Sequence, residues 1–242
     1  MLDDRELIQR NVDEVRRRIA DAATRSGRDP GDVTLVAATK TVAVGRIRLA
    51  VDAGVTVLGE NYVKELGPKR AEIAGVSWHF IGTLQSGTAN RIADLADVVE
   101  TVAGERAARR LAGRAARSGR RLDALIEVDL TEGRTGVRPD DLPAFADLVG
   151  SLEGLRLIGL MTVPAIPHEP EESRPSFARL RELREQLQER HPDVLESSMG
   201  MSLDYEVAVE EGATMVRIGT AIFGSRDVGP SEAARPNEEE RA

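Results

Sequence analysis

Short apolar runs alternate with segments of helical periodicity along almost the whole chain, and this alternation constrains the fold most strongly. The runs begin near residues 33, 56, 78, 98, 122, 155, 194 and 214. Such alternation predicts βαβ units and a parallel sheet, which places the chain in the α/β class. Eight units in 242 residues fit a closed (β/α)8 barrel better than an open sheet, so we predict a single TIM-like barrel.

A further helix is expected ahead of the barrel. Residues 3–27 carry apolar side chains at helical spacing and end on Gly27, which predicts an amphipathic helix. We expect the barrel, with this leading helix, to span residues 1–226. Residues 227–242 include two prolines and three consecutive glutamates, which is typical of a disordered acidic tail.

Composition narrows the classes of function. The net charge of −8 gives the chain no general attraction to nucleic acid or to anionic membranes. Without cysteine and with three dispersed histidines, the chain is not expected to bind zinc or to use a thiol nucleophile. The charged N-terminus does not resemble a signal peptide, and no apolar stretch is long enough to cross a bilayer, so we expect a cytoplasmic protein.

One arginine-rich segment, residues 105–121, could be taken for a nucleic-acid patch. It contains seven arginines but no aromatic residue on which a base could stack. The better interpretation is a barrel helix with arginines on its outer face.

Lys40 follows the first predicted strand, Val33–Ala38, at its carboxyl end. The chain has only three lysines against thirty arginines, so a lysine at this place is notable. Arginine stays protonated at any ordinary pH, whereas a desolvated lysine can act as a nucleophile or form a Schiff base. Since parallel barrels place their chemistry at the carboxyl ends of the strands, Lys40 is a candidate site residue. A solvated lysine just beyond a strand is the simpler alternative.

Two loops near the end of the chain predict an anion site. The segment from Ser197 to Ser202 combines hydroxyls with a glycine before a helix, and Arg217 precedes Gly219 and Thr220. Backbone N–H groups and hydroxyls in such loops bind phosphate, and barrels often place a phosphate after strands seven and eight. A lysine at strand one and a phosphate cradle at strands seven and eight together suggest pyridoxal 5′-phosphate. Arg217 would then face the pyridine nitrogen. A Schiff base between Lys40 and a sugar phosphate is an alternative.

Seven ordered motifs between about residues 33 and 226 resemble one known family. They are Ala38-Thr39-Lys40, Gly59-Glu60-Asn61-Tyr62, Trp78-His79-Phe80-Ile81-Gly82, Leu84-Gln85-Ser86, Gly159-Leu160-Met161-Thr162, Ser198-Met199-Gly200-Met201-Ser202, and Val216-Arg217-Ile218-Gly219 running on to Phe223-Gly224. This set resembles the pyridoxal phosphate homeostasis proteins (the YggS/PROSC family).

The resemblance implies a fold-type III barrel, similar to the N-terminal domain of alanine racemase, with the cofactor on Lys40. It also implies binding roles for further residues. The phosphate would be held by Ser198, Ser202, Gly219 and Thr220, the ring nitrogen would meet Arg217, and the pocket would be lined by Asn61, His79 and Met161. Family members are thought to buffer or deliver the cofactor to pyridoxal-phosphate-dependent apoenzymes, and no residue is assigned a catalytic role.

The chain departs from the family pattern at two places. It has Ser86-Gly87-Thr88 where the family usually has Ser-Asn-Lys, and Arg134 where a lysine is usual. Both departures remove lysines that could take up or pass on the cofactor.

The alternative to a carrier is an amino-acid racemase. Two-base racemisation needs a second acid/base group besides the lysine, and the only tyrosines, Tyr62 and Tyr205, are each near the start of a predicted helix. We therefore predict a cofactor-binding protein without turnover. A barrel mouth without a covering domain also makes a monomer the expected state.

Overall fold

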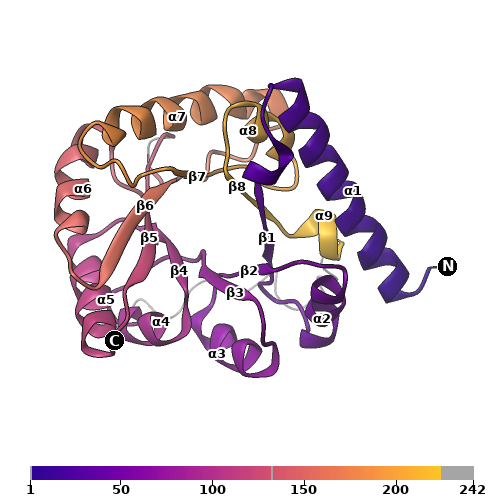
Figure 1. The fold of residues 1–242 in the computed structure, drawn as a ribbon, viewed down its shortest axis with the longest axis horizontal. Helices are drawn as coiled ribbons and strands as arrows, with labels where there is room; N and C mark the ends of the chain where they lie inside the picture. Colours follow the sequence, from indigo (N-terminus) through magenta and orange to yellow (C-terminus); the bar gives the residue numbers. More distant parts are fainter. Residues whose placement is uncertain (1, 132, 225–242) are drawn as a thin grey trace.

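The structure, a computed structural model, describes residues 2–131 and 133–224. Within these residues, eight parallel strands form a closed barrel in sequence order, with helices around it (Figure 1). The strands are β1 (Thr34–Ala38), β2 (Val57–Glu60), β3 (Ser77–Phe80), β4 (Val98–Val102), β5 (Leu122–Glu127), β6 (Leu155–Met161), β7 (Glu196–Ser198) and β8 (Met215–Ile218). The predicted barrel is confirmed.

The helices follow the strands as the sequence predicts. In the described ranges they are α1 (Asp4–Arg25), α2 (Val44–Asp52), α3 (Val63–Glu72), α4 (Ala89–Leu95), α5 (Glu105–Arg117), α6 (Leu142–Gly150), α7 (Arg174–Gln188), α8 (Tyr205–Glu210) and the short α9 (Thr220–Phe223). Three single 3₁₀ turns, η1 (Pro30–Asp32), η2 (Pro139–Asp141) and η3 (Pro170–Ser173), complete the described part.

The leading helix α1 is confirmed, and it packs along the barrel beside α2, α8 and α9 (Figure 1). Its start is fixed by a capping box in which Asp3 and Glu6 each accept a hydrogen bond from the other's backbone N–H. The buried face includes Ile8, Val12 and Ile19. The side chain of Asn11 donates to the Ile222 carbonyl at 2.9 Å. This bond attaches α1, which precedes the first strand, to α9, which follows the last one.

Two apolar layers hold the barrel. Outward-facing strand residues such as Leu58 and Trp78 belong to one large cluster with the surrounding helices. Inside the barrel, Val98, Leu125 and Met161 form a separate cluster. Parallel strands covered in this way are buried on both faces, which explains why they appear in the sequence as continuous apolar runs.

The arginine-rich segment forms α5, which buries alanines and Leu111 against the barrel. Three of its arginines are paired with neighbours. Arg109 bonds Glu105 and Arg114 bonds Asp94, both at 2.7 Å, while Arg110 donates to the Ser86 carbonyl at 3.0 Å. This arrangement confirms an amphipathic barrel helix.

Two predicted boundaries are wrong for local reasons. The sequence predicts a helix from Gln85, but the Gln85 carbonyl accepts from Thr88 N in a turn, so α4 starts only at Ala89. The strand predicted to continue to Leu130 ends at Glu127, because Val128 makes only a single bridge, to Val137.

The predicted tail, residues 227–242, and the predicted barrel limit at residue 226 lie outside the described residues. Among the residues that the structure does describe, no helix combines the length and the apolarity needed to cross a membrane.

Candidate functional site

Lys40 lies in a tight turn directly after β1. Thr39 N donates to the Gly59 carbonyl at 2.8 Å, and Val42 N closes the turn on the Thr39 carbonyl at 2.9 Å. Thr41 has a φ of 62°, a left-handed conformation that a β-branched residue rarely adopts. Such strain persists only where surrounding contacts impose it, and it is common at ligand sites. The half-buried Lys40 is thus held at the barrel mouth by a fixed backbone.

Closure of the barrel brings Lys40 beside the predicted anion loops. Strand β1 pairs with β8 in a register that sets Ala37 opposite Ile218, so Lys40 and Gly219 follow neighbouring strands at the same end. A Cβ added at Gly219 would lie 3.5 Å from Ala38, an ordinary contact. Packing therefore does not require a glycine there, whereas close approach of an anion would favour one.

The loops after β7 and β8 are joined by hydrogen bonds. Ala221 N donates to Ser202 Oγ at 3.2 Å, and Arg217 N donates to the Gly200 carbonyl at 3.0 Å. Gly200 has a φ of 90°, and a Cβ there would approach the Cβ of Ala208 to 2.5 Å, so this position does need glycine. The hydrogen bond of Ala221 N brings Ser202 to the loop that holds Gly219 and the exposed Thr220. That these three residues bind phosphate stays a prediction.

Asp204, which the sequence analysis did not single out, fixes the first of these loops. It is buried, and its carboxylate accepts from Met201 N at 2.7 Å and from Ser173 Oγ at 2.7 Å. These two bonds close residues 201–204 into a turn and attach the turn to η3.

We expect Asp204→Ala to lower the free energy of unfolding by about 2 kcal/mol, because two buried donors lose their acceptor. Ser173→Ala removes only one of the two bonds and should cost about 1 kcal/mol. Urea unfolding of both variants checks this prediction, and equal stability of Asp204→Ala and the wild type would contradict it.

A buried polar chain crosses the barrel interior below the mouth. His79 Nδ1 is 2.6 Å from Glu100 Oε1, and Ser198 Oγ donates to Glu100 Oε2 at 2.5 Å. Arg217 donates to Ser198 Oγ at 2.5 Å and to the Thr162 carbonyl at 2.8 Å. Three predicted site residues therefore lie together, and Glu100 links them. The predicted contact of Ser198 with phosphate stays a prediction.

Asn61 and Met161 line a cavity of about 300 Å³ at the barrel mouth, together with Glu127, Arg134 and Thr101. The Oδ1 atom of Asn61 is buried and has no hydrogen-bond partner among the described residues. Arg134, which replaces the lysine usual in the family, donates to the Val163 and Pro164 carbonyls at 3.0 and 2.8 Å. This arginine therefore ties the loop after β5 to the loop after β6.

Glu127 ends β5 and lines this cavity. Burial raises the pKa of Glu127 to about 7, although the nearby Arg217 opposes the shift. Because the carboxyl binds its proton more tightly in the folded state than in the unfolded chain, folding stability decreases as pH rises from about 4.5 to about 7.

We expect Glu127→Gln to remove this dependence. The stability of the wild type relative to the variant should fall by about 2 kcal/mol between pH 5 and pH 8. Urea unfolding at both pH values measures the difference, and Glu105→Gln on the exposed side of α5 is the matched control. A constant difference across this range would contradict the prediction.

Glu60 and Lys69 form a buried ion pair on the outer side of the site. Lys69 Nζ lies 2.7 Å from Glu60 Oε2, from Glu65 Oε2 and from the Thr39 carbonyl. Glu60 also accepts from the backbone N–H groups of Asn61 and Tyr62 at 2.7 and 3.0 Å. Glu60 therefore supports the chain around Lys40 and Asn61 by capping the start of the segment that leads into α3.

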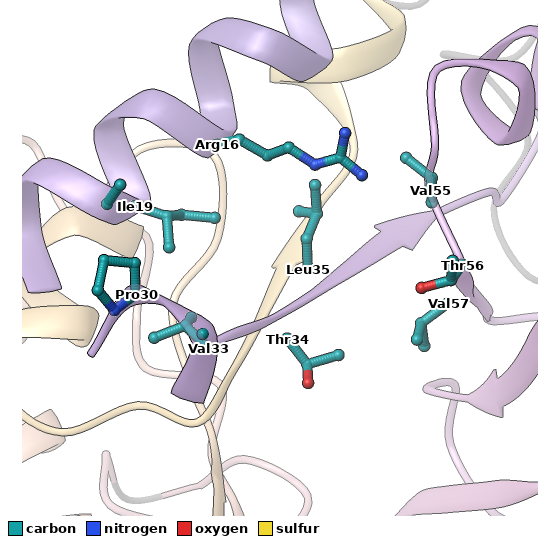
Figure 2. A pocket seen from close by; sticks show the side chains of 11 residues that line it. Arg16, Ile19, Pro30, Val33, Thr34, Leu35, Val55, Thr56 and Val57 are labelled. Carbon is teal, nitrogen blue, oxygen red and sulfur yellow. The ribbon is translucent and has the colours of Figure 1, made fainter. Parts of the chain in front are cut away.

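A larger cavity of about 500 Å³ lies at the opposite end of the barrel, between α1, η1 and the amino ends of β1 and β2. Figure 2 shows Ile19, Val33 and Leu35 gathered there. Arg16, the charged residue of this lining, donates to the Ala53 and Gly54 carbonyls at 2.9 and 2.6 Å. It satisfies carbonyl groups where α2 ends, so its role is structural.

Comparison with known proteins agrees with this geometry. The sequence model of the family described as "Alanine racemase, N-terminal domain" matches residues 5–227. A pyridoxal phosphate homeostasis protein of Pseudomonas aeruginosa is 41% identical over 226 residues, which cover 92% of this chain and 97% of the relative. The chain belongs to the pyridoxal phosphate homeostasis proteins. The member from Escherichia coli K12 is 38% identical over 234 residues and covers 91% of this chain and 97% of its own.

Several solved structures share the fold. PipY of Synechococcus elongatus, determined with PLP bound, is 34% identical with a TM-score of 0.76, covering 85% of this chain and 100% of its own. An unknown protein from Bifidobacterium adolescentis has a TM-score of 0.85 at 34% identity and covers 92% of this chain and 97% of its own. Alanine racemase of Clostridium difficile, 18% identical with a TM-score of 0.73, covers 93% of this chain and 58% of its own and shows the shared fold alone. The resemblance found in the motifs is thus confirmed.

Proposed function

We propose that this member of the pyridoxal phosphate homeostasis proteins binds pyridoxal 5′-phosphate and buffers or delivers it in the cytoplasm. The observation that carries the proposal is the position of Lys40, held in a strained turn on the strand next to the β8 loop. When bound, the cofactor supplies an aldehyde that combines reversibly with a lysine amine.

The residues at the mouth fit such a ligand. Asn61 offers a buried acceptor that no described residue hydrogen-bonds, and Gly219 lets an anion approach the backbone more closely than a residue with a Cβ would. Ser202 and Thr220 lie where a phosphate could be bound, and Arg217 presents a buried guanidinium. A ring with a phosphate at one end and an aldehyde toward Lys40 matches this distribution of groups.

Each residue then has a defined task. Lys40 would attach the cofactor, the loops with Ser198, Ser202, Gly219 and Thr220 would hold its phosphate, and Arg217 would meet its ring nitrogen. The pocket walls would be Asn61, His79 and Met161. An arginine, unlike a carboxylate, does not keep the ring nitrogen protonated, so it disfavours chemistry that needs a strong electron sink.

We further propose that the protein is a monomeric carrier without turnover and that apoenzymes dependent on the cofactor receive it. The tyrosines support a carrier. Tyr205 is buried, and burial raises its pKa to about 12, so its hydroxyl keeps its proton at neutral pH and does not serve as the second base. Tyr62 is nearly half exposed, and its ring is covered by Lys64, whose Nζ is 5.9 Å from the ring centre. Neither tyrosine is therefore a buried, ionisable partner for Lys40.

The test is a transfer assay. The protein is loaded with pyridoxal 5′-phosphate, freed of excess cofactor and mixed with an apo-aminotransferase, whose recovered activity is followed in time. The control is the same concentration of cofactor bound to an unrelated pyridoxal-phosphate protein. Faster recovery of aminotransferase activity with the present protein than with this control supports delivery. Racemisation of alanine by the loaded protein at rates above the free cofactor would favour the racemase alternative, and no transfer at all would contradict delivery.

A further inference from the structure

Glu100 is a fully buried carboxylate at the centre of the barrel, and neither the motifs nor the family comparisons give it a role. It lies on β4 and reaches His79 on β3 and Ser198 on β7, at 2.6 and 2.5 Å. The same Ser198 hydroxyl accepts from Arg217 of β8, whose guanidinium is itself 3.8 Å from the carboxylate. Side chains of β3, β7 and β8 therefore converge on one carboxylate of β4.

The charge of Glu100 follows from its partners. Burial alone would raise the pKa of Glu100, but the hydrogen bond from His79 and the charge of Arg217 hold it below its ordinary value. An ionised carboxylate only accepts hydrogen bonds, so His79 Nδ1 and Ser198 Oγ must both donate to it. A buried charge of this kind is tolerated because every contact around it compensates the lost water.

With Glu100 ionised, the Ser198 hydroxyl has no free donor. Its single proton goes to Glu100, and one of its lone pairs accepts from Arg217. The hydroxyl therefore has no proton left for a phosphate oxygen. Arg217 has five N–H donors, and within residues 2–131 and 133–224 two of them are engaged, one by Ser198 and one by the Thr162 carbonyl. Those two bonds fix the plane of the guanidinium and leave its other N–H groups for a ligand.

We propose that Glu100 is a positioning residue for the cofactor ring: acting through Ser198, it holds Arg217 in the orientation that donates to the ring nitrogen. Ser198 thus acts on the cofactor ring indirectly, by orienting Arg217. The phosphate is bound by Ser202, Gly219 and Thr220. This inference rests on the proposed function, since it concerns the same ligand. It adds a residue to the site and reassigns another.

The test compares two ligands in two proteins. Pyridoxal 5′-phosphate and its 1-deaza analogue, which has a carbon in place of the ring nitrogen, are titrated by absorption and fluorescence into the wild type and Glu100→Gln. A charge-assisted hydrogen bond predicts that the wild type prefers the natural cofactor by about tenfold. In Glu100→Gln the amide keeps one acceptor oxygen of the two and loses the charge near Arg217, so the guanidinium is oriented less firmly and the preference should fall to about twofold or less.

A purely structural role gives a different result. If Glu100 only stabilises the barrel, both ligands lose affinity by the same factor, the preference stays at about tenfold, and the proposal is overturned. Asp97→Asn is the matched control. Asp97 is half-buried and bonded to Arg70 and Trp78 N at the opposite end of β4, and its variant should keep the preference.

Ser198→Ala serves if Glu100→Gln does not fold. Our account predicts that this variant also loses the preference for the ring nitrogen, while keeping the preference for pyridoxal 5′-phosphate over pyridoxal. If Ser198→Ala instead lost its preference for pyridoxal 5′-phosphate over pyridoxal, Ser198 would be a phosphate-binding residue and the inference would be overturned. A wild type that binds neither ligand would contradict the proposed function itself, so the two failures are distinguishable.

Discussion

Replacing Lys40 by arginine should abolish covalent binding of pyridoxal 5′-phosphate. Arginine keeps the positive charge on a side chain that is at least as long, but its guanidinium stays protonated and cannot attack an aldehyde. We expect the visible band of the bound cofactor to disappear. The dissociation constant should rise by roughly two orders of magnitude if the attachment contributes about 2.8 kcal/mol. Absorption spectra and equilibrium dialysis measure the two effects.

Lys64→Arg is the matched control for this substitution. Lys64 follows β2 at the same end of the barrel, and its ammonium lies over the ring of the exposed Tyr62. Its replacement should leave the band and the affinity unchanged. If Lys40→Arg still gave the band and Lys64→Arg did not, the assignment of the anchor would be wrong.

Replacing Lys69 by methionine should have the largest effect on stability. Lys69 is 6% exposed and its partner Glu60 is fully buried, so the substitution leaves a buried carboxylate without its cation. Loss of one partner from a buried pair costs roughly 3 to 5 kcal/mol. Because Lys69 also bonds the Thr39 carbonyl, the turn that presents Lys40 should loosen, and cofactor affinity should fall as well.

Urea unfolding of Lys69→Met beside Lys64→Met separates the buried lysine from an exposed one. The exposed substitution is expected to change the free energy of unfolding by less than about 0.5 kcal/mol. Similar effects of the two substitutions would show that the Glu60–Lys69 pair does not support the site.

The sequence predicts the fold well because each strand of a covered parallel barrel is a continuous apolar run. Lys40 and Arg217 also stand out in the sequence. Lys40 lies two residues beyond the first apolar run, and Arg217 lies within the last one, shortly before Gly219. The general rule that barrels keep their chemistry at the carboxyl ends of the strands then brings these distant residues to one face. The pairing of β1 with β8 needs no further information once closure is assumed.

Glu100, Glu127 and Asp204 could not be predicted from the sequence, for three different reasons. Glu100 lies inside an apolar run, where alternation of the strand points it into the barrel, and one charged residue within Val98–Val102 was the available signal. Glu127 became the mouth residue because β5 ends three residues before the predicted limit at Leu130. Asp204 accepts one hydrogen bond from nearby Met201 N and one from Ser173 in η3, and the second, which attaches the loop to η3, depends on a contact 31 residues away in the chain.

The most direct test of the account is borohydride reduction of the wild-type protein loaded with pyridoxal 5′-phosphate, followed by peptide mass mapping. The account predicts one pyridoxyl adduct, on the peptide that contains Lys40, together with loss of the visible band on reduction. An adduct on Lys64 or Lys69 would contradict the assignment of the anchor. No band and no adduct after incubation with the cofactor would contradict the proposed function and return Lys40 to the sugar-phosphate alternative.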